Sequence, residues 1–308
     1  MKAYNPLISI TIPTYGGGNN LKRSLDSVLS QDYTNWECLV VDDNGIGTPN
    51  QLKTAKIIKQ YEDDIRIHYI CHSENRNGSA ARNTGIRNSK GEFVCVLDDD
   101  DEYTPEFLSC QVAVFKTLSH KYPLTYVSKS NYVNGIKYDE LHVSKNDEVN
   151  LVELFTEFPI GACCYMLRRE VYDAVGGYDE SFKRHQDWEF LQKILAQFKL
   201  AKGIDRICYK RYVTARNNPK NSYQAKQYRL HYLNKMKPYI DQLNEQDRKY
   251  IYDYHFTTLS FIYLENRDFV LFLKEFFVQK PGMIFYKTFY KRLRNIVTNR
   301  LKLERWKI

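Results

Sequence analysis

The chain has 308 residues, of which 43% are hydrophobic and 27% are charged. This composition is typical of a folded globular protein and excludes a wholly disordered chain. The length suffices for one large α/β domain with a smaller addition, and no apolar run is long enough for a transmembrane helix.

The net charge of +8 is unevenly spread along the chain. Residues 280–307 contain nine Lys or Arg and one acid, Glu304, so this segment alone carries an excess of eight positive charges. The N-terminus lacks a signal-peptide pattern, and the seven cysteines show neither disulfide nor zinc spacing. We therefore expect reduced cysteines and a cytoplasmic location, and the basic segment leaves open a peripheral position on the inner face of the cell membrane.

The first hundred residues alternate between strand and helix patterns. Short apolar runs predict four buried strands, at residues 7–12, 38–41, 67–70 and 93–97. Helical patterns lie between them, at residues 21–29, 52–61 and 78–89. This alternation is typical of a parallel α/β sheet, and polar clusters follow the strands at the edge where such sheets bind ligands.

The rest of the chain predicts two further regions. Residues 124–216 alternate less regularly and indicate a mixed, partly antiparallel sheet. Beyond Asn221 the chain is helical and rich in Tyr and Phe, and residues 217–221 are the best linker candidate. We therefore predict one domain over residues 1–216 and a helical, basic region over residues 217–308.

Four consecutive acids, Asp98 to Asp101, follow the fourth predicted strand. Mg²⁺ and Mn²⁺ prefer carboxylate oxygens, and a strand end holds such groups rigidly. The alternative is an acidic turn before a helix capped by Thr104, with Pro105 at its first position.

Two polar segments follow the second and third strands. Asp42 and Asp43 can hold a ribose hydroxyl or a base edge, and the alternative is an ordinary turn before Gly45. The segment from Asn75 to Gly85 opens a helix with small residues, and its arginine, Arg82, can pair with phosphate. A plain glycine-rich cap is the alternative.

Asp187 lies where a helix over residues 190–195 is expected to begin. A carboxylate at this place can remove a proton from an acceptor hydroxyl, as a general base does. The alternative is an acid that only favours the N-terminal end of its helix.

Together these segments resemble glycosyltransferase family 2, the large inverting group with the GT-A fold, over roughly residues 7–215. The matching segments occur in the family's order and spacing. They are Ser9–Tyr15, Ser27–Gln31, Val41–Asp43, Ala81–Gly85, Gly91–Asp101 and Gly176–Glu189. The implied fold is α/β, a Rossmann-like, mostly parallel sheet flanked by helices, with a helical C-terminal extension.

The resemblance also implies roles for individual residues. A base pocket, contacts to the donor, a metal site and a catalytic base are expected. The base pocket would be lined by Pro13, Thr14 and Tyr15, and Asp43 would hold the base or ribose. Asn75 and Arg82 would add donor contacts, and Asp98 and Asp99 would face the ribose and sugar. Asp100 would bind Mn²⁺ or Mg²⁺, and Asp187 would be the catalytic base.

Three departures from the family pattern are visible. Gln186 replaces the acid that commonly precedes the base, and Gly16–Gly18 replace the more usual Asn after Tyr15. The family often carries an Arg-x-His-like loop after the sheet. Here Arg211 and Arg216 are present without the histidine, so no metal role is assigned there.

The resemblance implies an inverting glycosyltransferase that uses a nucleotide diphosphate sugar, best guessed as UDP-hexose or UDP-N-acetylhexosamine. Its acceptor would be a hydroxyl of a glycan or lipid-linked oligosaccharide in cell-surface polysaccharide biosynthesis. The residues 1–120 would bind the donor and residues 121–216 would face the acceptor. No nucleic-acid partner is expected, and the sequence does not determine the oligomeric state.

Two other functions have to be weighed. A sugar-phosphate nucleotidyltransferase usually needs a glycine-rich, basic loop directly after the first strand, whereas here Lys22 and Arg23 lie only on the following helix. A non-enzymatic nucleic-acid-binding module could use the basic tail, but the acidic clusters would repel phosphate. Apolar residues from Phe285 to Leu301 recur at helical spacing, so residues 281–308 are expected either to lie on an anionic membrane surface or to pack on the catalytic domain.

Overall fold

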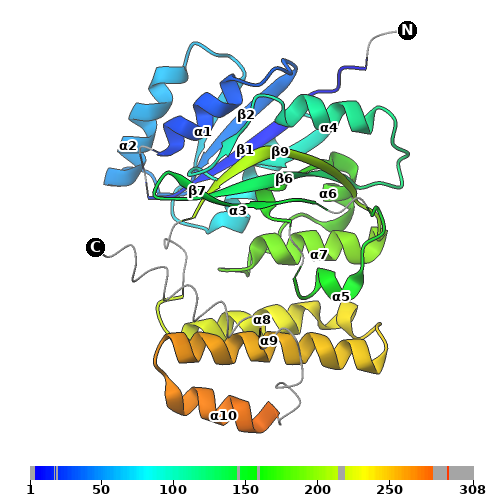
Figure 1. Cartoon of the computed structure of the whole chain (residues 1–308). Helices are drawn as coiled ribbons and strands as arrows, with labels where there is room; N and C mark the ends of the chain where they lie inside the picture. The colour runs from blue at the N-terminus through cyan, green and yellow to red at the C-terminus, as the bar shows by residue number, and fades with distance from the viewer. Residues whose placement is uncertain are drawn as a thin grey trace. The chain divides into compact units, whose positions relative to one another are not determined.

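The computed structural model describes residues 4–16, 18, 20–143, 146–157, 160–213, 219–279 and 290. The chain divides into two compact units, residues 1–217 and residues 218–308. Each unit is described by itself (Figure 1).

Four parallel strands form the first half of the sheet in the N-terminal unit, in the order β3-β2-β1-β4. They are β1 (Ile8–Thr14), β2 (Trp36–Asp42), β3 (Ile67–Cys71) and β4 (Phe93–Val96). The helices between them are α1 (Asn20–Leu29), α2 (Pro49–Ile58) and α3 (Gly78–Asn88), and a short 3₁₀ helix (Lys59–Tyr61) follows α2. These elements confirm the α/β alternation predicted from the sequence.

The second half of the sheet is mixed, as the sequence predicted. The full order is β3-β2-β1-β4-β8-β6-β9-β5, with β7 paired to β6. Strand β8 is antiparallel to β4 and β6, whereas β9 runs parallel to β6. The strands are β5 (Glu102–Tyr103), β6 (Leu124–Val133), β7 (Ile136–Leu141), β8 (Tyr165–Arg168) and β9 (Lys202–Tyr212). The helices are α4 (Phe107–Phe115), α5 (Leu151–Leu154), α6 (Arg169–Val175) and α7 (Gln186–Phe198), with a 3₁₀ helix at Ala162–Cys164.

Helices cover both faces of this sheet, with α1 and α4 on one face and α3, α6 and α7 on the other (Figure 1). Helix α3 packs closely against β1 because residue 85 is a glycine. A Cβ atom there would lie 2.2 Å from Cγ2 of Thr11 on β1. All seven residues of β2 are buried, as expected for a parallel strand covered on both faces.

The predicted start of α4 is wrong. Thr104 does not cap the helix, and the first helical residue is Phe107 rather than Pro105. The chain stays extended through Tyr103 because β5 pairs with β9, and the Thr104 amide donates to the Cys208 carbonyl at 2.9 Å. A sheet contact more than a hundred residues away therefore overrides a local capping signal.

The C-terminal unit is helical, as predicted. It contains α8 (Ser222–Ile240), α9 (Glu245–Glu265) and α10 (Phe269–Gln279). Ala225, Leu259 and Tyr263 form a buried cluster against which Leu271 and Phe272 of α10 pack. Within the described part of the chain, no helix is long and apolar enough to cross a membrane. The predicted basic amphipathic helix over residues 281–308 lies outside the described residues, apart from Tyr290, and so does residue 216.

Candidate functional site

The acids Asp98 to Asp101, here called the acidic loop, follow β4 and are held from one side by α1. The Ser24 hydroxyl donates to the Asp101 carbonyl at 2.7 Å, with the Asp98 carbonyl 3.2 Å away. The Arg23 guanidinium donates to the Asp100 carbonyl. These bonds use backbone oxygens of the loop, so they fix its path without consuming its carboxylates.

From the other side the acidic loop is anchored by β9 through Asp101. The Tyr209 hydroxyl and the Tyr212 amide donate to the two Asp101 carboxylate oxygens, the latter at 2.7 Å. Burial and, next to it, the nearby charge of Asp98 raise the pKa of the Asp101 carboxyl to about 8, although the bonds from Tyr209 and Tyr212 lower it. Asp101 is only 3% exposed, so its role is to hold the loop.

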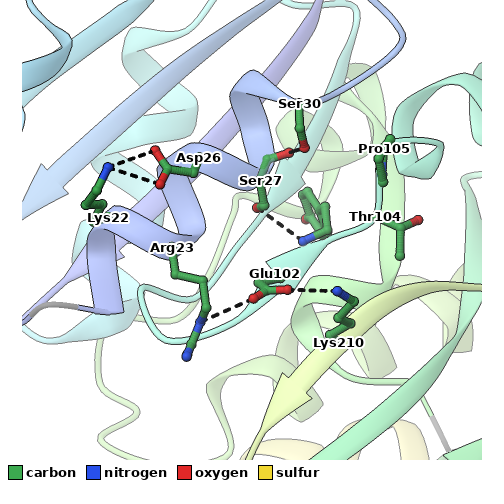
Figure 2. Close-up of a pocket in the computed structure, with 10 residues that line it drawn as sticks. Lys22, Arg23, Asp26, Ser27, Ser30, Glu102, Thr104, Pro105 and Lys210 are labelled. Atoms are coloured by element: carbon green, nitrogen blue, oxygen red, sulfur yellow. Dashed lines mark hydrogen bonds and ion pairs between the residues drawn. The ribbon is translucent and has the colours of Figure 1, made fainter. Parts of the chain in front are cut away.

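A groove of about 510 Å³ lies beside the acidic loop, between α1, β5 and β9. Figure 2 shows Arg23 reaching from α1 toward Glu102, which also pairs with Lys210 at 3.1 Å. The Arg23 guanidinium stacks on the Tyr212 ring at 3.7 Å. The charged groups of the groove are thus paired with one another, and Arg23 among them also donates to the Asp100 carbonyl of the acidic loop.

Asp99 is joined to the end of β1, where the sequence predicted the base pocket. The Thr14 hydroxyl donates to the Asp99 carboxylate at 2.6 Å, and the Tyr15 amide donates to the same oxygen at 3.3 Å. Asp99 is 7% exposed, whereas the Tyr15 side chain is 53% exposed. Pro13 and Thr14 are the last two residues of β1, which places all three predicted pocket residues at the carboxyl edge of the sheet.

Asp43, predicted to hold the base or ribose, is engaged by the segment before α3. Its two carboxylate oxygens accept from the Asn75 amide group at 3.0 Å and from the backbone amides of Arg76 and Asn77 at 2.8 Å each. The His72 Nδ1 atom lies 2.7 Å away. With four partners and 2% exposure, Asp43 orders this loop, and a direct bond to a nucleotide would need one of these partners to give way.

Arg82 joins the acidic loop to the start of α7. Its Nη2 atom donates to an Asp98 oxygen at 2.7 Å, and its Nη1 atom donates to the Gln186 carboxamide oxygen at 2.8 Å. Gly78 leaves the space for this contact, because a Cβ there would lie 2.9 Å from the Gln186 oxygen. This bridge brings together three of the sequence motifs, which are 16 and 104 residues apart along the chain.

Asp187 follows Gln186 in the first turn of α7 and is partly exposed. The pKa of Arg211, on β9, is affected by Asp187 and by Asp101 of the acidic loop. Burial lowers the pKa of the Arg211 guanidinium, but Tyr209, Asp101 and Asp187 together raise it above its ordinary value. Gln186, the residue before Asp187, contacts Arg82, which pairs with Asp98, so the start of α7 lies near the acidic loop.

The donor atoms suit a hard divalent cation. Asp98 and Asp100 are both partly exposed carboxylates at a strand end, the ligand type that Mg²⁺ and Mn²⁺ prefer. Among the described residues, ligand atoms of Asp98, Asp101 and Cys163 lie within 4.8 Å of one another. Burial and the charge of Asp98 raise the pKa of the Cys163 thiol, and sulfur is a softer ligand than Mg²⁺ or Mn²⁺ prefers.

Several residues of this arrangement were not predicted from the sequence. They are Arg23 and Ser24 on α1, Tyr209 and Tyr212 on β9, and His72 after β3. Nothing in the sequence indicated that β9 would reach the acidic loop. The seven cysteines are free, as expected.

The mixed sheet flanked by helices is that of the GT-A fold. The chain belongs to glycosyl transferase family 2, whose model matches residues 9–176, more than half of the 308 residues. This result confirms the resemblance seen in the sequence motifs.

Relatives by sequence carry glycosyltransferase names. An uncharacterised glycosyltransferase of Rickettsia typhi is 31% identical over 198 residues, which is 62% of this chain and 59% of the relative. A putative colanic acid biosynthesis glycosyl transferase of Escherichia coli is 41% identical over 109 residues, 35% of this chain and 38% of the relative. The amylovoran biosynthesis glycosyltransferase of Erwinia amylovora is 25% identical and covers 75% of this chain and 78% of its own length. The chain spans between 28% and 59% of the length of five Rickettsia relatives.

Solved structures share the fold. TarS of S. aureus has a TM-score of 0.60 at 20% identity, covering 81% of this chain and 43% of TarS. A mannosyltransferase from Pyrobaculum calidifontis, in complex with GDP-Man and Mn²⁺, has a TM-score of 0.59 at 16% identity, covering 84% of this chain and 72% of the other. Residues 1–349 of TarS in complex with UDP-GlcNAc give a TM-score of 0.57 at 16% identity, covering 82% of this chain and 80% of that one.

Proposed function

We propose that the chain is an inverting glycosyltransferase that transfers a sugar from a nucleoside diphosphate donor to a hydroxyl of a glycan or lipid-linked oligosaccharide. The observation that carries this proposal is the Arg82 bridge, which ties the acidic loop through Asp98 to the residue before Asp187. A metal-binding carboxylate and a base are the two groups that this reaction requires.

In the proposed reaction the donor diphosphate lies at the acidic loop. Asp100, with Asp98 beside it, would hold Mn²⁺ or Mg²⁺, which supplies Lewis-acid stabilisation of the departing diphosphate. Arg82 would add a positive charge at the same edge, and Thr14 and Tyr15 would line the base pocket. A UDP-sugar is the first choice of donor, supported by the UDP-GlcNAc complex of TarS.

Asp187 would accept the proton of the attacking hydroxyl as that oxygen attacks the anomeric carbon. The diphosphate would leave from the opposite face, so an α-linked donor would give a β-linked product. A base held in position is worth on the order of 10²–10⁴-fold in rate. The names of relatives in colanic acid and amylovoran biosynthesis support a role in cell-surface polysaccharide synthesis.

The base assignment is tested by Asp187→Asn. We expect transfer to fall by about 10²-fold or more, while binding of UDP with Mn²⁺, measured by calorimetry, stays within about threefold. Glu170→Gln is the matched control, because Glu170 is also a first-turn acid, on α6, and is exposed. Near-normal turnover of Asp187→Asn would show that another group is the base.

Product analysis tests the reaction class. Release of the nucleoside diphosphate with a β-linked product, identified by NMR, is expected from an α-linked donor. Release of pyrophosphate would instead indicate a nucleotidyltransferase. The division of labour between residues 1–120 for the donor and 121–216 for the acceptor is part of the same proposal.

A further inference from the structure

Two cysteines lie in contact where helix α4 packs beside strand β9. The Sγ atoms of Cys110 on α4 and Cys208 on β9 are 3.8 Å apart, although the two residues are 98 positions apart in the sequence. All seven cysteines belong to the described part of the chain, and among them no other two sulfur atoms form a hydrogen-bonding contact. A disulfide bond has an S–S length of about 2.05 Å, so these sulfurs would have to approach by only about 1.8 Å.

The two thiols differ in access and in acidity. Cys110 is partly exposed, whereas Cys208 is fully buried. The Cys110 thiol donates its hydrogen to the Cys208 sulfur, and this bond, with a smaller contribution from the charge of Arg206, lowers the pKa of the Cys208 thiol despite its burial. The same bond, together with burial, raises the pKa of the Cys110 thiol. A reagent can therefore reach Cys110, while Cys208 ionises more readily to the nucleophilic thiolate.

Cys208 belongs to the stretch of β9 that anchors the acidic loop. Its carbonyl accepts from the Thr104 amide at 2.9 Å, and the next residue, Tyr209, donates to the Asp101 carboxylate. A covalent bond from Cys208 to α4 would oppose local opening of this stretch, because opening would also have to displace the helix.

We propose that Cys110 and Cys208 are a redox-active dithiol, which a low-molecular-weight disulfide such as oxidised glutathione converts into an intramolecular disulfide that links α4 to β9. The bond is reversible, so the stability of the β9 anchor follows the thiol–disulfide balance around the protein. This property lies beyond the transfer reaction and depends on neither the donor nor the acceptor.

Cys110 reacts first, because it is the accessible sulfur. Its sulfur attacks one sulfur of the small disulfide while its proton passes to Cys208, so a mixed disulfide forms on Cys110 and one small thiolate leaves. Cys208 then gives up that proton to water, and its thiolate attacks the Cys110 sulfur, which releases the second small thiolate. Two protein thiols are oxidised to one disulfide, and one small disulfide is reduced to two thiols.

Peptide mapping of the full chain tests the bond itself. The protein is incubated with oxidised glutathione, its remaining thiols are alkylated, and its peptides are analysed by mass spectrometry. We expect a peptide pair joined through Cys110 and Cys208, the loss of two alkylatable thiols per chain, and recovery of both thiols after treatment with dithiothreitol.

Two single variants serve as the specific change and its control. Cys110→Ser keeps a hydrogen-bond donor beside Cys208 but removes the sulfur, so the joined peptide pair should disappear. Cys71 is also partly exposed but has no sulfur partner, so Cys71→Ser should form the Cys110–Cys208 bond as the wild type does. Circular dichroism checks that both variants are folded.

Hydrogen exchange tests the effect of the bond on β9. The Thr104 amide donates to the Cys208 carbonyl, so its exchange reports opening of this part of the strand. We expect exchange about tenfold slower or more in the oxidised wild type than in the reduced wild type. Cys110→Ser treated with the same oxidant should show no such slowing.

Three results would overturn the proposal. The thiols of Cys110 and Cys208 could both survive treatment with diamide, a stronger oxidant, which would make them inert packing residues. The oxidised chain could instead carry its disulfide at another cysteine. Equal exchange of the Thr104 amide in the oxidised and reduced wild type would show that the bond does not hold β9. Calorimetric binding of UDP with Mn²⁺ to the reduced chain measures the donor site separately, so failure of the proposed function is distinguishable from each of these.

Discussion

Two acidic clusters follow buried strands in the N-terminal unit, and the fold uses them differently. After β2, Asp42 and Asp43 are 0% and 2% exposed, and both are saturated by nearby residues. After β4, Asp98 keeps 37% of its side chain exposed, and the loop is held mainly by its carbonyls and by Asp101. The carboxylates of the first cluster are buried and accept hydrogen bonds from nearby donors, whereas Asp98 and Asp100 of the second cluster are partly exposed.

The difference arises from what packs beyond each strand end. The segment from His72 to Asn77 wraps over Asp43 and directs two backbone amides at it. Asn77 adopts a φ of 83°, a conformation that asparagine tolerates better than most residues, and its own side chain caps α3. Beside β4, Ser24 and Arg23 donate to backbone oxygens, while donors from other elements reach the carboxylates of Asp99 and Asp101. A strand-end acid pair is therefore an ambiguous signal until the donors around it are known.

The largest effect on function is expected at Asp100, in the cluster after β4. Asp100→Ala should reduce Mn²⁺-dependent UDP binding by about 100-fold, because the proposed cation site would lose a carboxylate ligand. The free energy of unfolding should change by less than about 1 kcal/mol. Calorimetry with and without Mn²⁺ measures the first quantity, and urea titration measures the second. Asp26→Ala, at an exposed acid of α1, is the control; a metal response of Asp100→Ala equal to that of this control would contradict the comparison.

The largest effect on stability is expected at Asp43, in the buried cluster after β2. In Asp43→Asn, the new amide group would face the amides of Arg76 and Asn77 and the side chain of Asn75, which are all donors. We expect a loss of about 3 kcal/mol in the free energy of unfolding, measured by urea titration. A loss as small as that of Asp100→Ala would mean that the two clusters do not differ in this way.

Much of this fold could be predicted from the sequence, and the reasons are local. The strands around Ile10, Val40 and Val94 are short apolar runs, and the small residues from Gly78 onward open α3 as expected. The clustering of the motifs at one sheet edge follows from the parallel order of strands. The roles of Asp100 and Asp187 remain predictions.

The remaining features depend on contacts between distant segments. Tyr209 meets Asp101 across 108 residues, and Gln186 meets Arg82 across 104. The pairing of β5 with the distant strand β9 likewise explains why α4 begins at Phe107 and not at the predicted Pro105. Neither local propensity nor spacing contains this information, because register between distant strands is set by the whole sheet.

A smaller effect is expected at Gly78, where the site is crowded. In Gly78→Ala the new Cβ would lie 2.9 Å from the Gln186 oxygen and 3.1 Å from Nη1 of Arg82. Both are ends of flexible side chains, so stability should hardly change, but the Arg82 bridge should shift and turnover should fall about tenfold. Steady-state kinetics with Gly161→Ala as control tests this, because a Cβ at Gly161 meets nothing closer than 3.9 Å. Unchanged kinetics of Gly78→Ala would remove the bridge from the mechanism.

The smallest effect concerns Glu189, a further acid that the fold has enclosed. Burial raises its pKa above the usual 4.5, although Lys193, 3.1 Å away, opposes the shift. An acid with a raised folded-state pKa contributes most to stability below its ordinary pKa, and that contribution is lost as pH rises through the raised value. Glu189→Gln lacks this loss, so its urea midpoint relative to the wild type should rise with pH above 4.5. A constant difference across the series would contradict it.

The anchoring of Asp101 by β9 has a consequence for synthesis of the chain. The four acids emerge from the ribosome long before Tyr209 and Tyr212, whose contacts fix the loop from 108 and 111 positions later. Until that last strand pairs with β6 and β5, Asp101 lacks the two donors that anchor its carboxylate. The acidic loop is therefore fully anchored only after Tyr209 and Tyr212 have been synthesised, so a chain truncated before them would keep the contacts from α1 and β1 but lose the anchor of Asp101.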